Sequence, residues 1–283
     1  MSKILLSADS TCDISGELLE STGARLFPMH IILGEKSYND GVDIKPDDIY
    51  ANFNATGRLP KTAAVNVGEY YDHFKPFVEQ GYDIIHINLG SALSSSYQNC
   101  VAAAKKLGHL YPVDSCNLSS GSGHLVIEAS KMIKEGLPAS EIAQQLRALT
   151  PKCHTSFVID KLDYLRAGGR CSTLAMLGAN LLRIKPSINV NNSDGSMTVG
   201  KKYRGPLEKV LVTYVHEKLE QYDKIRDERI FVTHAGIGEK YVKIVRDEVE
   251  KLKYFRNIYT ERASCTISSH CGPGTIGILF MTE

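Results

Sequence analysis

Residues 83–89 read DIIHINL, a short apolar run rich in β-branched side chains, and this composition predicts a buried strand. The polar loop GSALSSS follows at 90–96, and apolar side chains then recur at helical spacing from 97 to 104. A second apolar run at 109–114 completes a strand–helix–strand unit. Crossovers of this kind join parallel strands, so the stretch predicts part of a parallel sheet with helices packed on it.

The same alternation continues on both sides of this unit. In the first half we expect strands at 3–8 and 26–33, a turn at 34–41, and helices that start at Pro46 and span 68–79, 119–135 and 140–149. In the second half we expect strands at 153–159, 184–190 and 229–234, a helical turn at 162–165, helices at 172–182, 206–222 and 239–252, a hairpin partner after 195, and two terminal strands. The pattern predicts an α/β protein of two domains: 1–150 with a parallel sheet and crossover helices, and 151–283 with a mixed sheet.

Composition excludes several classes of function. The 283 residues include 33 lysines and arginines against 32 aspartates and glutamates, so the net charge of +1 gives no electrostatic basis for nucleic-acid binding. Apolar runs such as 276–281 are shorter than the roughly 20 residues of a transmembrane helix. Asp9 interrupts the apolar stretch near the N-terminus, which argues against a secretion signal. We therefore expect a cytoplasmic protein with no transmembrane segment.

Common catalytic and metal motifs are missing from the sequence. Seven cysteines include no C-x-x-C pair and nine histidines no H-E-x-x-H, so we expect buried, reduced thiols and no metal site. There is no P-loop and no G-x-S-x-G elbow. A G-x-G-x-x-G match at 272–277 is followed by only six residues, too few for the crossover helix of a dinucleotide site, and it is interpreted as a tight turn or a close backbone approach.

Four polar segments remain as candidate sites, each with a plain structural alternative. The loop 90–97 lies between a strand end and a helix start, where anions bind, but one of its serines is also a natural helix cap. Lys61-Thr62 by itself indicates a turn. Residues 167–170 (AGGR) place Arg170 beside paired glycines, as a ligand clamp or an ion-pair residue. Residues 269–274 (SHCGPG) fix His270 beside a rigid turn, as an anion donor or a structural histidine.

These segments occur together in an order that resembles the DegV family of bacterial fatty-acid-binding proteins. The resemblance covers essentially the whole chain and is carried by the motifs DSTCD at 9–13, YNDGVDI at 38–44, PKT at 60–62, SALS at 91–94 with Tyr97-Gln98, VDS at 113–115, LDYL at 162–165, GGR at 168–170, IKP at 184–186 and HCGPG at 270–274. A single motif of this kind is weak evidence for the resemblance, whereas the order that all of them share is specific to the family.

The resemblance implies two α/β domains with a ligand tunnel between them that holds a long acyl chain. It assigns the fatty carboxylate to Thr62, Ser94 and His270, with the backbone near Ser95 as a further donor. Burial of each methylene gains about 0.8 kcal/mol, so a tail of about 14 gains on the order of 11 kcal/mol before the costs of binding. Candidate wall residues are Phe27, Met29, Leu174, Met176, Leu177 and Leu181, which ordinary core packing would also explain.

The function implied by the resemblance is delivery without catalysis or a cofactor. The protein would present the bound carboxylate to a separate ATP-dependent fatty acid kinase, and the acyl phosphate would serve phospholipid synthesis. Arg170 and Arg204 are candidates for contact with the kinase or the phosphate, against the alternative of ordinary surface charges.

Two other classes of function stay open on the sequence alone. In a hydrolase or phosphotransferase, Ser94 would be the nucleophile and His270 the base, with a carboxylate such as Asp9 or Asp114 close to His270 in space. A sugar- or nucleotide-binding module would instead require a polar cavity.

Overall fold

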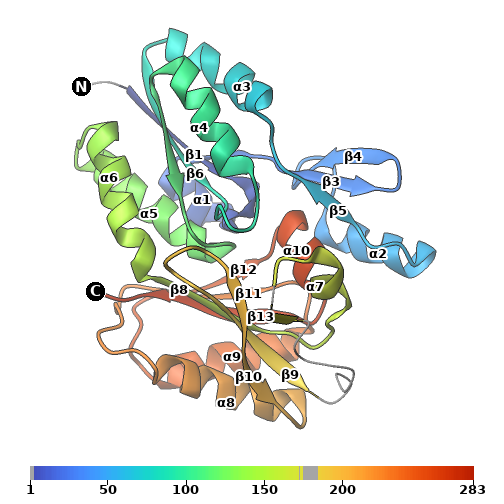
Figure 1. Cartoon of the computed structure of the whole chain (residues 1–283). Coiled ribbons are helices and arrows are strands. Elements are labelled where there is room, and N and C mark those ends of the chain that lie inside the picture. The colour runs from blue at the N-terminus through green and yellow to red at the C-terminus, as the bar shows by residue number, and fades with distance from the viewer. Residues whose placement is uncertain (1–2, 172, 175–183) are drawn as a thin grey trace.

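The computed structural model describes residues 3–171, 173–174 and 184–283, and its N-terminal half is built on a parallel sheet (Figure 1). The predicted strand at 83–89 forms β6 (Tyr82–Asn88), and the sheet order is β2-β1-β6-β7. The other strands are β1 (Lys3–Asp9), β2 (Arg25–Phe27) and β7 (Leu110–Asp114), and each neighbouring pair is parallel. Helix α4 (Ser96–Leu107) joins β6 to β7, so the predicted crossover is confirmed.

Helices cover both faces of this sheet because its side chains alternate in direction. Leu5 and Ile84 pack with α3 (Val67–Glu79) and α4, whereas Leu6 and Ile85 pack with α5 (Ser120–Lys134) and α6 (Ala139–Leu149). The short segments α1 (Gly16–Thr22) and η1 (Ser10–Cys12) follow β1 and also contact α5.

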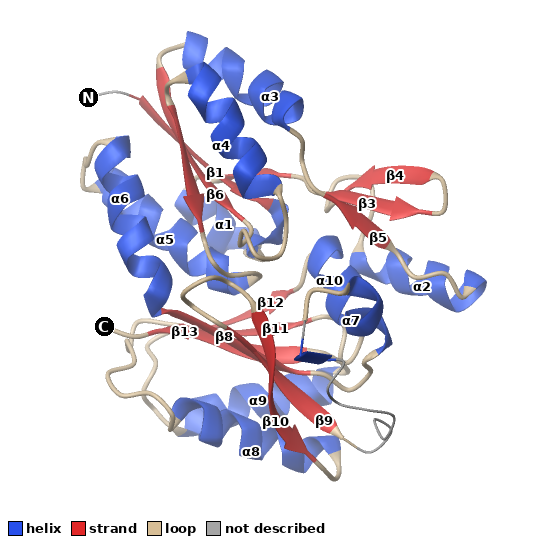
Figure 2. Cartoon of the chain, viewed as in Figure 1, coloured by secondary structure: helices blue, strands red, loops and turns tan. Residues whose placement is uncertain are grey.

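The second half forms a six-stranded mixed sheet with the order β10-β9-β8-β13-β11-β12. Its strands are β8 (Cys153–Val158), β9 (Lys185–Val190), β10 (Met197–Tyr203), β11 (Ile230–His234), β12 (Ile258–Arg262) and β13 (Ile276–Met281). The β11–β12 pair is parallel, and the other four pairs are antiparallel. Helices α8 (Leu207–Leu219) and α9 (Glu239–Lys251) pack side by side on one face (Figure 2).

Helix α5 lies between the two sheets. One apolar cluster contains Leu6 and Ile85 of the parallel sheet, Leu125 of α5, and Phe231 and Leu279 of the mixed sheet. The chain passes from one sheet to the other through α6 and η2 (Thr150–Lys152), near the predicted boundary. The division into domains at residue 150 remains a prediction.

A smaller unit projects from the first half and contacts the second. Strands β3 (His30–Leu33), β4 (Lys36–Asn39) and β5 (Lys61–Ala63) form a three-stranded sheet in the order β4-β3-β5, accompanied by α2 (Pro46–Thr56). Figure 1 shows α7 (Asp163–Gly168) and α10 (Cys265–Cys271) between this unit and the mixed sheet.

The strand expected at 26–33 is wrong as one strand, because β2 pairs with β1 in the parallel sheet and β3 pairs with β4 and β5 in the small sheet. The turn at 34–41 is wrong in extent because Lys36–Asn39 pairs with β3, and the turn at Lys61-Thr62 is wrong because both residues belong to β5. Helix α10 was not predicted. The apolar helix expected at 172–182 falls almost entirely outside the described residues.

The parallel and mixed sheets with their covering helices confirm the α/β class. All seven cysteines are free, and six of them are buried. In the described part of the chain, no helix combines the length and apolar character needed to span a bilayer.

Candidate functional site

Three segments that are far apart in the sequence meet around one cavity of about 210 Å³, here called the Thr62 cavity. They are β5, the loop after β6, and α10. The polar side chains at its wall are those of Thr62, Ser94, Ser95, Arg170, Thr266 and His270. Its apolar wall comes from Met29, Ala63, Ala64, Leu89, Leu93, Leu118, Met197 and Ile267. The four carboxylate-binding residues predicted from the resemblance therefore lie at one cavity.

Thr62 and His270 are joined directly. Strand β5 pairs Thr62 with Ile31 of β3, and the last turn of α10 carries His270, so that Thr62 Oγ1 lies 2.8 Å from His270 Nε2. Burial, with a smaller contribution from the Arg170 guanidinium, lowers the pKa of His270 from 6.5 to about 4. The imidazole is therefore neutral at pH 7, with one nitrogen as donor and the other as acceptor.

The other ring nitrogen of His270 faces α7. This Nδ1 atom is buried and has no hydrogen-bond partner in the described chain. A Cβ atom at Gly168 would lie 2.4 Å from it, so α7 reaches this position only because residue 168 is glycine. Arg170 Nη1 donates to the carbonyl of Gly168 at 2.7 Å and its Nε donates to the carbonyl of Leu93 at 3.3 Å, which ties the end of α7 to the loop after β6.

The serines of that loop mark the start of α4. Ser94 Oγ accepts the backbone N–H of Ser96 at 3.2 Å and lies 2.9 Å from Ser96 Oγ, so the Ser94 side chain satisfies the first N–H of α4. Ser95 is the residue before the helix and its side chain is exposed. Two carboxylates hold the base of the loop: Asp9 accepts the N–H of Leu89 at 2.8 Å and Asp114 that of Ser91 at 3.0 Å.

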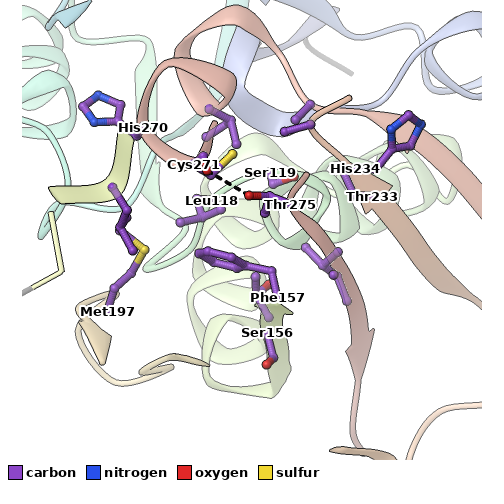
Figure 3. A pocket seen from close by; sticks show the side chains of 17 residues that line it. Leu118, Ser119, Ser156, Phe157, Met197, Thr233, His234, His270, Cys271 and Thr275 are labelled. Atoms are coloured by element: carbon purple, nitrogen blue, oxygen red, sulfur yellow. Dashed lines mark hydrogen bonds between the residues drawn. The ribbon is translucent and has the colours of Figure 1, made fainter. Parts of the chain in front are cut away.

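A second, apolar cavity of about 60 Å³ adjoins the first and is called the Phe157 cavity (Figure 3). The two cavities share Leu118, Met197, Ile267 and His270. Figure 3 shows Leu118, Phe157 and Met197 around the space, with His270 at one side. The site thus has hydroxyl and imidazole groups at one end and hydrocarbon at the other.

Several hydroxyl groups lie along the Phe157 cavity, but their hydrogen bonds are made elsewhere. Ser119 donates to Asp13, Ser156 to Asn189 and Thr275 to the carbonyl of Cys271, while Thr233 pairs with Ser120. Thr155 Oγ1 lines the same cavity and is buried without a hydrogen-bond partner in the described chain, so the wall is apolar apart from this hydroxyl.

The other predicted residues occupy different positions. Met29 lines the Thr62 cavity. Phe27 packs in the core against Tyr70, with ring centroids 5.1 Å apart, and Leu174 is buried in the same apolar cluster. Arg204 is exposed just beyond β10. Met176, Leu177 and Leu181 lie outside the described residues.

Some lining residues were not predicted. Leu118, Phe157, Met197, Thr266 and Ile267 line one or both cavities, and the sequence carried only a weak signal for them. Phe157 lies in a predicted strand, but no periodicity indicates which face of that strand borders a cavity. Thr266 stands four residues before His270 and so shares its helix face, a relation that becomes visible once α10 is known.

The glycine motif at 272–277 forms the expected turn. Gly272 has φ +73° and Gly274 φ +86°, and a Cβ atom at Gly272 would lie 2.7 Å from the Tyr164 ring. This turn ends α10 and leads into β13. The interpretation as a turn with close backbone approach is confirmed.

The contacts do not join Ser94 and His270 as a nucleophile and its base. Ser94 Oγ pairs with Ser96, and His270 Nε2 pairs with Thr62. Asp9 bonds His86 and Tyr70, and Asp114 bonds backbone N–H groups. Within the described residues, no group of three or more histidines, cysteines or acidic side chains is placed to hold a metal ion.

A family model and curated relatives match the chain over its whole length. A family model described as "Uncharacterised protein, DegV family" matches residues 3–283. A DegV domain-containing protein of Clostridium acetobutylicum is 31% identical over 287 residues and one of Clostridium perfringens 29% identical over 289, each covering 100% of both chains.

Solved structures share the fold over the full length. A DegV family protein from Thermus thermophilus, described as fatty acid binding, superposes with a TM-score of 0.89 at 24% identity, covering 99% of this chain and 100% of that one. A fatty-acid-binding DegV family protein from Streptococcus agalactiae gives 0.88 at 22% identity, with 100% of both chains covered. A stearic-acid-binding protein from Eubacterium ventriosum gives 0.82 at 24% identity, covering 100% of this chain and 98% of that one.

Proposed function

The chain belongs to the DegV family, and we propose that it binds a long-chain fatty acid, with the carboxylate in the Thr62 cavity and the tail directed toward the Phe157 cavity. The observation that carries this proposal is the junction of the two cavities at His270. A ligand that extends through this junction must be polar at one end and apolar along its length. A sugar or nucleotide would leave its hydroxyl groups against the apolar wall without partners.

The head-group chemistry suits an anion held mainly by neutral hydrogen-bond donors. Ser94 offers a hydroxyl donor and the backbone beside Ser95 an N–H, while Thr62 and the neutral imidazole of His270 offer theirs when the bond between them is exchanged for bonds to the carboxylate. Hydrogen bonds to a charged acceptor are stronger than neutral ones, and they offset the cost of removing a carboxylate from water. Arg170 adds a cation at the cavity wall. The tail supplies most of the affinity and the head contacts fix the orientation.

We further propose that the protein is a carrier without a cofactor, acting in the cytoplasm. It would present the carboxylate to an ATP-dependent fatty acid kinase, which forms an acyl phosphate for phospholipid synthesis. The position of Ser94, Ser95 and Arg170 at the outer wall of the cavity supports this, since Ser95 and Arg170 are exposed. The pairing of Ser94 with Ser96 does not favour the hydrolase alternative.

The decisive experiment is mass spectrometry of an organic extract of the purified protein, followed by removal of lipid and rebinding of defined fatty acids. We expect a long-chain fatty acid in about stoichiometric amount and rebinding that a Thr62→Val, Ser94→Ala double variant weakens. No fatty acid in the extract and no rebinding by the delipidated protein would overturn the proposal. Ester hydrolysis that Ser94→Ala abolishes would support the hydrolase instead.

A further inference from the structure

Asp40 has a buried carboxylate, and both of its oxygens accept hydrogen bonds. The residue lines neither the Thr62 cavity nor the Phe157 cavity. Its side chain is 2% exposed. Oδ1 accepts the backbone N–H of Cys265 at 2.8 Å, and Oδ2 accepts that of Thr266 at 3.0 Å and the hydroxyl of Ser10 at 3.0 Å. Two of the three donors belong to the first turn of α10, the helix that carries His270.

Helix α10 depends on such external partners for its position. It has seven residues, and a helix of this length is not stable on its own in water. In every α-helix the backbone N–H groups of the first turn have no acceptor within the helix itself. Here Asp13 takes the N–H of Ser264 at 2.9 Å, Asp40 takes those of Cys265 and Thr266, and the hydroxyl of Ser264 takes that of Ile267.

Asp40 also connects this helix start to the opposite wall of the Thr62 cavity. The Asp40 backbone N–H donates to the carbonyl of Met29 at 2.8 Å. Ser10 Oγ, which donates to Asp40, accepts the N–H of Met29 at 3.1 Å. Met29 lines the cavity, as do Thr266 and His270 on one face of α10. The Asp40 carboxylate therefore sets the separation between the Met29 wall and the helix that presents His270.

We propose that Asp40 is a positioning residue for the carboxylate site: it fixes α10, and through α10 the imidazole of His270, against the Met29 wall. The proposal rests on the proposed function, and it adds a residue that does not touch the ligand. Its effect should fall on recognition of the acid group and spare the apolar tail, because Asp40 holds the part of α10 that forms the head end.

The test compares a fatty acid with the fatty alcohol of the same chain length, in the full chain after removal of lipid. Asp40→Asn keeps the size of the side chain but removes its charge and replaces one acceptor with a donor. We expect it to weaken fatty-acid binding by about tenfold or more, the scale of one charge-assisted hydrogen bond, and to change alcohol binding by less than about threefold. In combination with His270→Ala, it should cause little further loss, since both changes disable the same contact.

Controls separate the proposal from general destabilisation. Glu261→Gln changes another buried carboxylate, which is 5% exposed and accepts a hydrogen bond from the Ser15 hydroxyl, and it should leave both affinities unchanged. If Asp40→Asn does not fold, Ser10→Ala removes a single donor to Asp40 and should give a smaller loss confined to the acid. Equal losses for acid and alcohol, or full additivity with His270→Ala, would overturn the role of Asp40. Failure of the unchanged protein to bind either lipid would overturn the proposed function itself.

Discussion

The hydroxyl of Thr62 and the imidazole of His270 lie 2.8 Å apart although 208 residues separate them in the chain. The bond joins the small sheet that projects from the first half to a helix inserted between strands of the second. Because burial keeps the imidazole neutral, the pair is a neutral hydrogen-bonding unit that can rearrange around an incoming anion.

Loss of the Thr62 hydroxyl should weaken fatty-acid binding without unfolding the protein. Thr62→Val keeps the shape of the side chain and its place in β5, but removes one donor to the carboxylate and the partner of His270 Nε2. We expect about tenfold weaker binding, measured by titration calorimetry. Thr213→Val, on the exposed side of α8, is the matched control. Unchanged affinity in Thr62→Val would contradict the assignment.

A methyl group at residue 168 should displace His270. In Gly168→Ala the new Cβ atom would lie 2.4 Å from His270 Nδ1, closer than packed atoms approach, so the ring or α7 must move. We expect fatty-acid affinity to fall by at least about tenfold while thermal unfolding changes by a few degrees. Gly238→Ala, where the nearest atom is 3.8 Å away, should affect neither measurement. Unchanged fatty-acid affinity in Gly168→Ala would show that binding does not depend on the position of His270.

Binding should not require a protonated His270. Its pKa, lowered to about 4, leaves the ring neutral throughout the range from pH 6 to 8. The ratio of dissociation constants between His270→Gln and the unchanged protein should therefore be constant across this range, as measured by a fluorescent fatty-acid displacement assay. If the imidazolium held the carboxylate, the ratio would decline by about tenfold per pH unit above the pKa of the ring.

Asp13 should make the protein less stable as the pH rises toward neutrality. Burial raises its pKa from 3.8 to about 7, despite hydrogen bonds from Ser119 and Ser264 that oppose the shift. The folded state thus holds a proton that the unfolded state has released, and this contribution to the free energy of unfolding falls between about pH 4 and 7. Asp13→Asn should remove the fall, so its stability relative to the unchanged protein should be higher at pH 7.5 than at pH 4.5 in urea titrations. The same difference at both pH values would mean that Asp13 is ionised throughout.

Arg204 tests the proposed contact with a kinase. The residue is exposed beyond β10 and lines neither cavity, so Arg204→Glu should leave fatty-acid affinity unchanged. Kinase-dependent formation of acyl phosphate from the bound lipid should decrease several-fold. Unchanged turnover would show that Arg204 is an ordinary surface charge.

Much of the fold could be predicted because its elements carry strong local patterns. The strand at 83–89 is a run of apolar, β-branched residues. Helical periodicity and residues that end helices mark the helix after it and the helices at 119–135 and 239–252. Strands β4 and β5 were not predicted. They are only four and three residues long and rich in polar side chains, and it is their pairing with β3 that makes them strands.

Only part of the candidate site could be predicted from the sequence. The family resemblance predicted Thr62, Ser94, Ser95 and His270 as site residues, and the fold brings these four residues to one cavity. Phe157 and Met197 could not be chosen from the many apolar residues, because a cavity depends on which faces are left uncovered after packing. The role of Asp40 lies in backbone contacts with residues more than 200 positions away, which leave no local signature.

Helix α5 has its apolar side chains in one cluster with strands from both sheets, and this shared packing has a thermodynamic consequence. Neither sheet can separate from α5 without exposing hydrocarbon that also supports the other, so heating should melt both halves in a single calorimetric transition. A lipid held at the meeting point of the two halves would raise that one melting temperature as a whole. A scan with and without lipid would then report occupancy of the site through the stability of the entire chain.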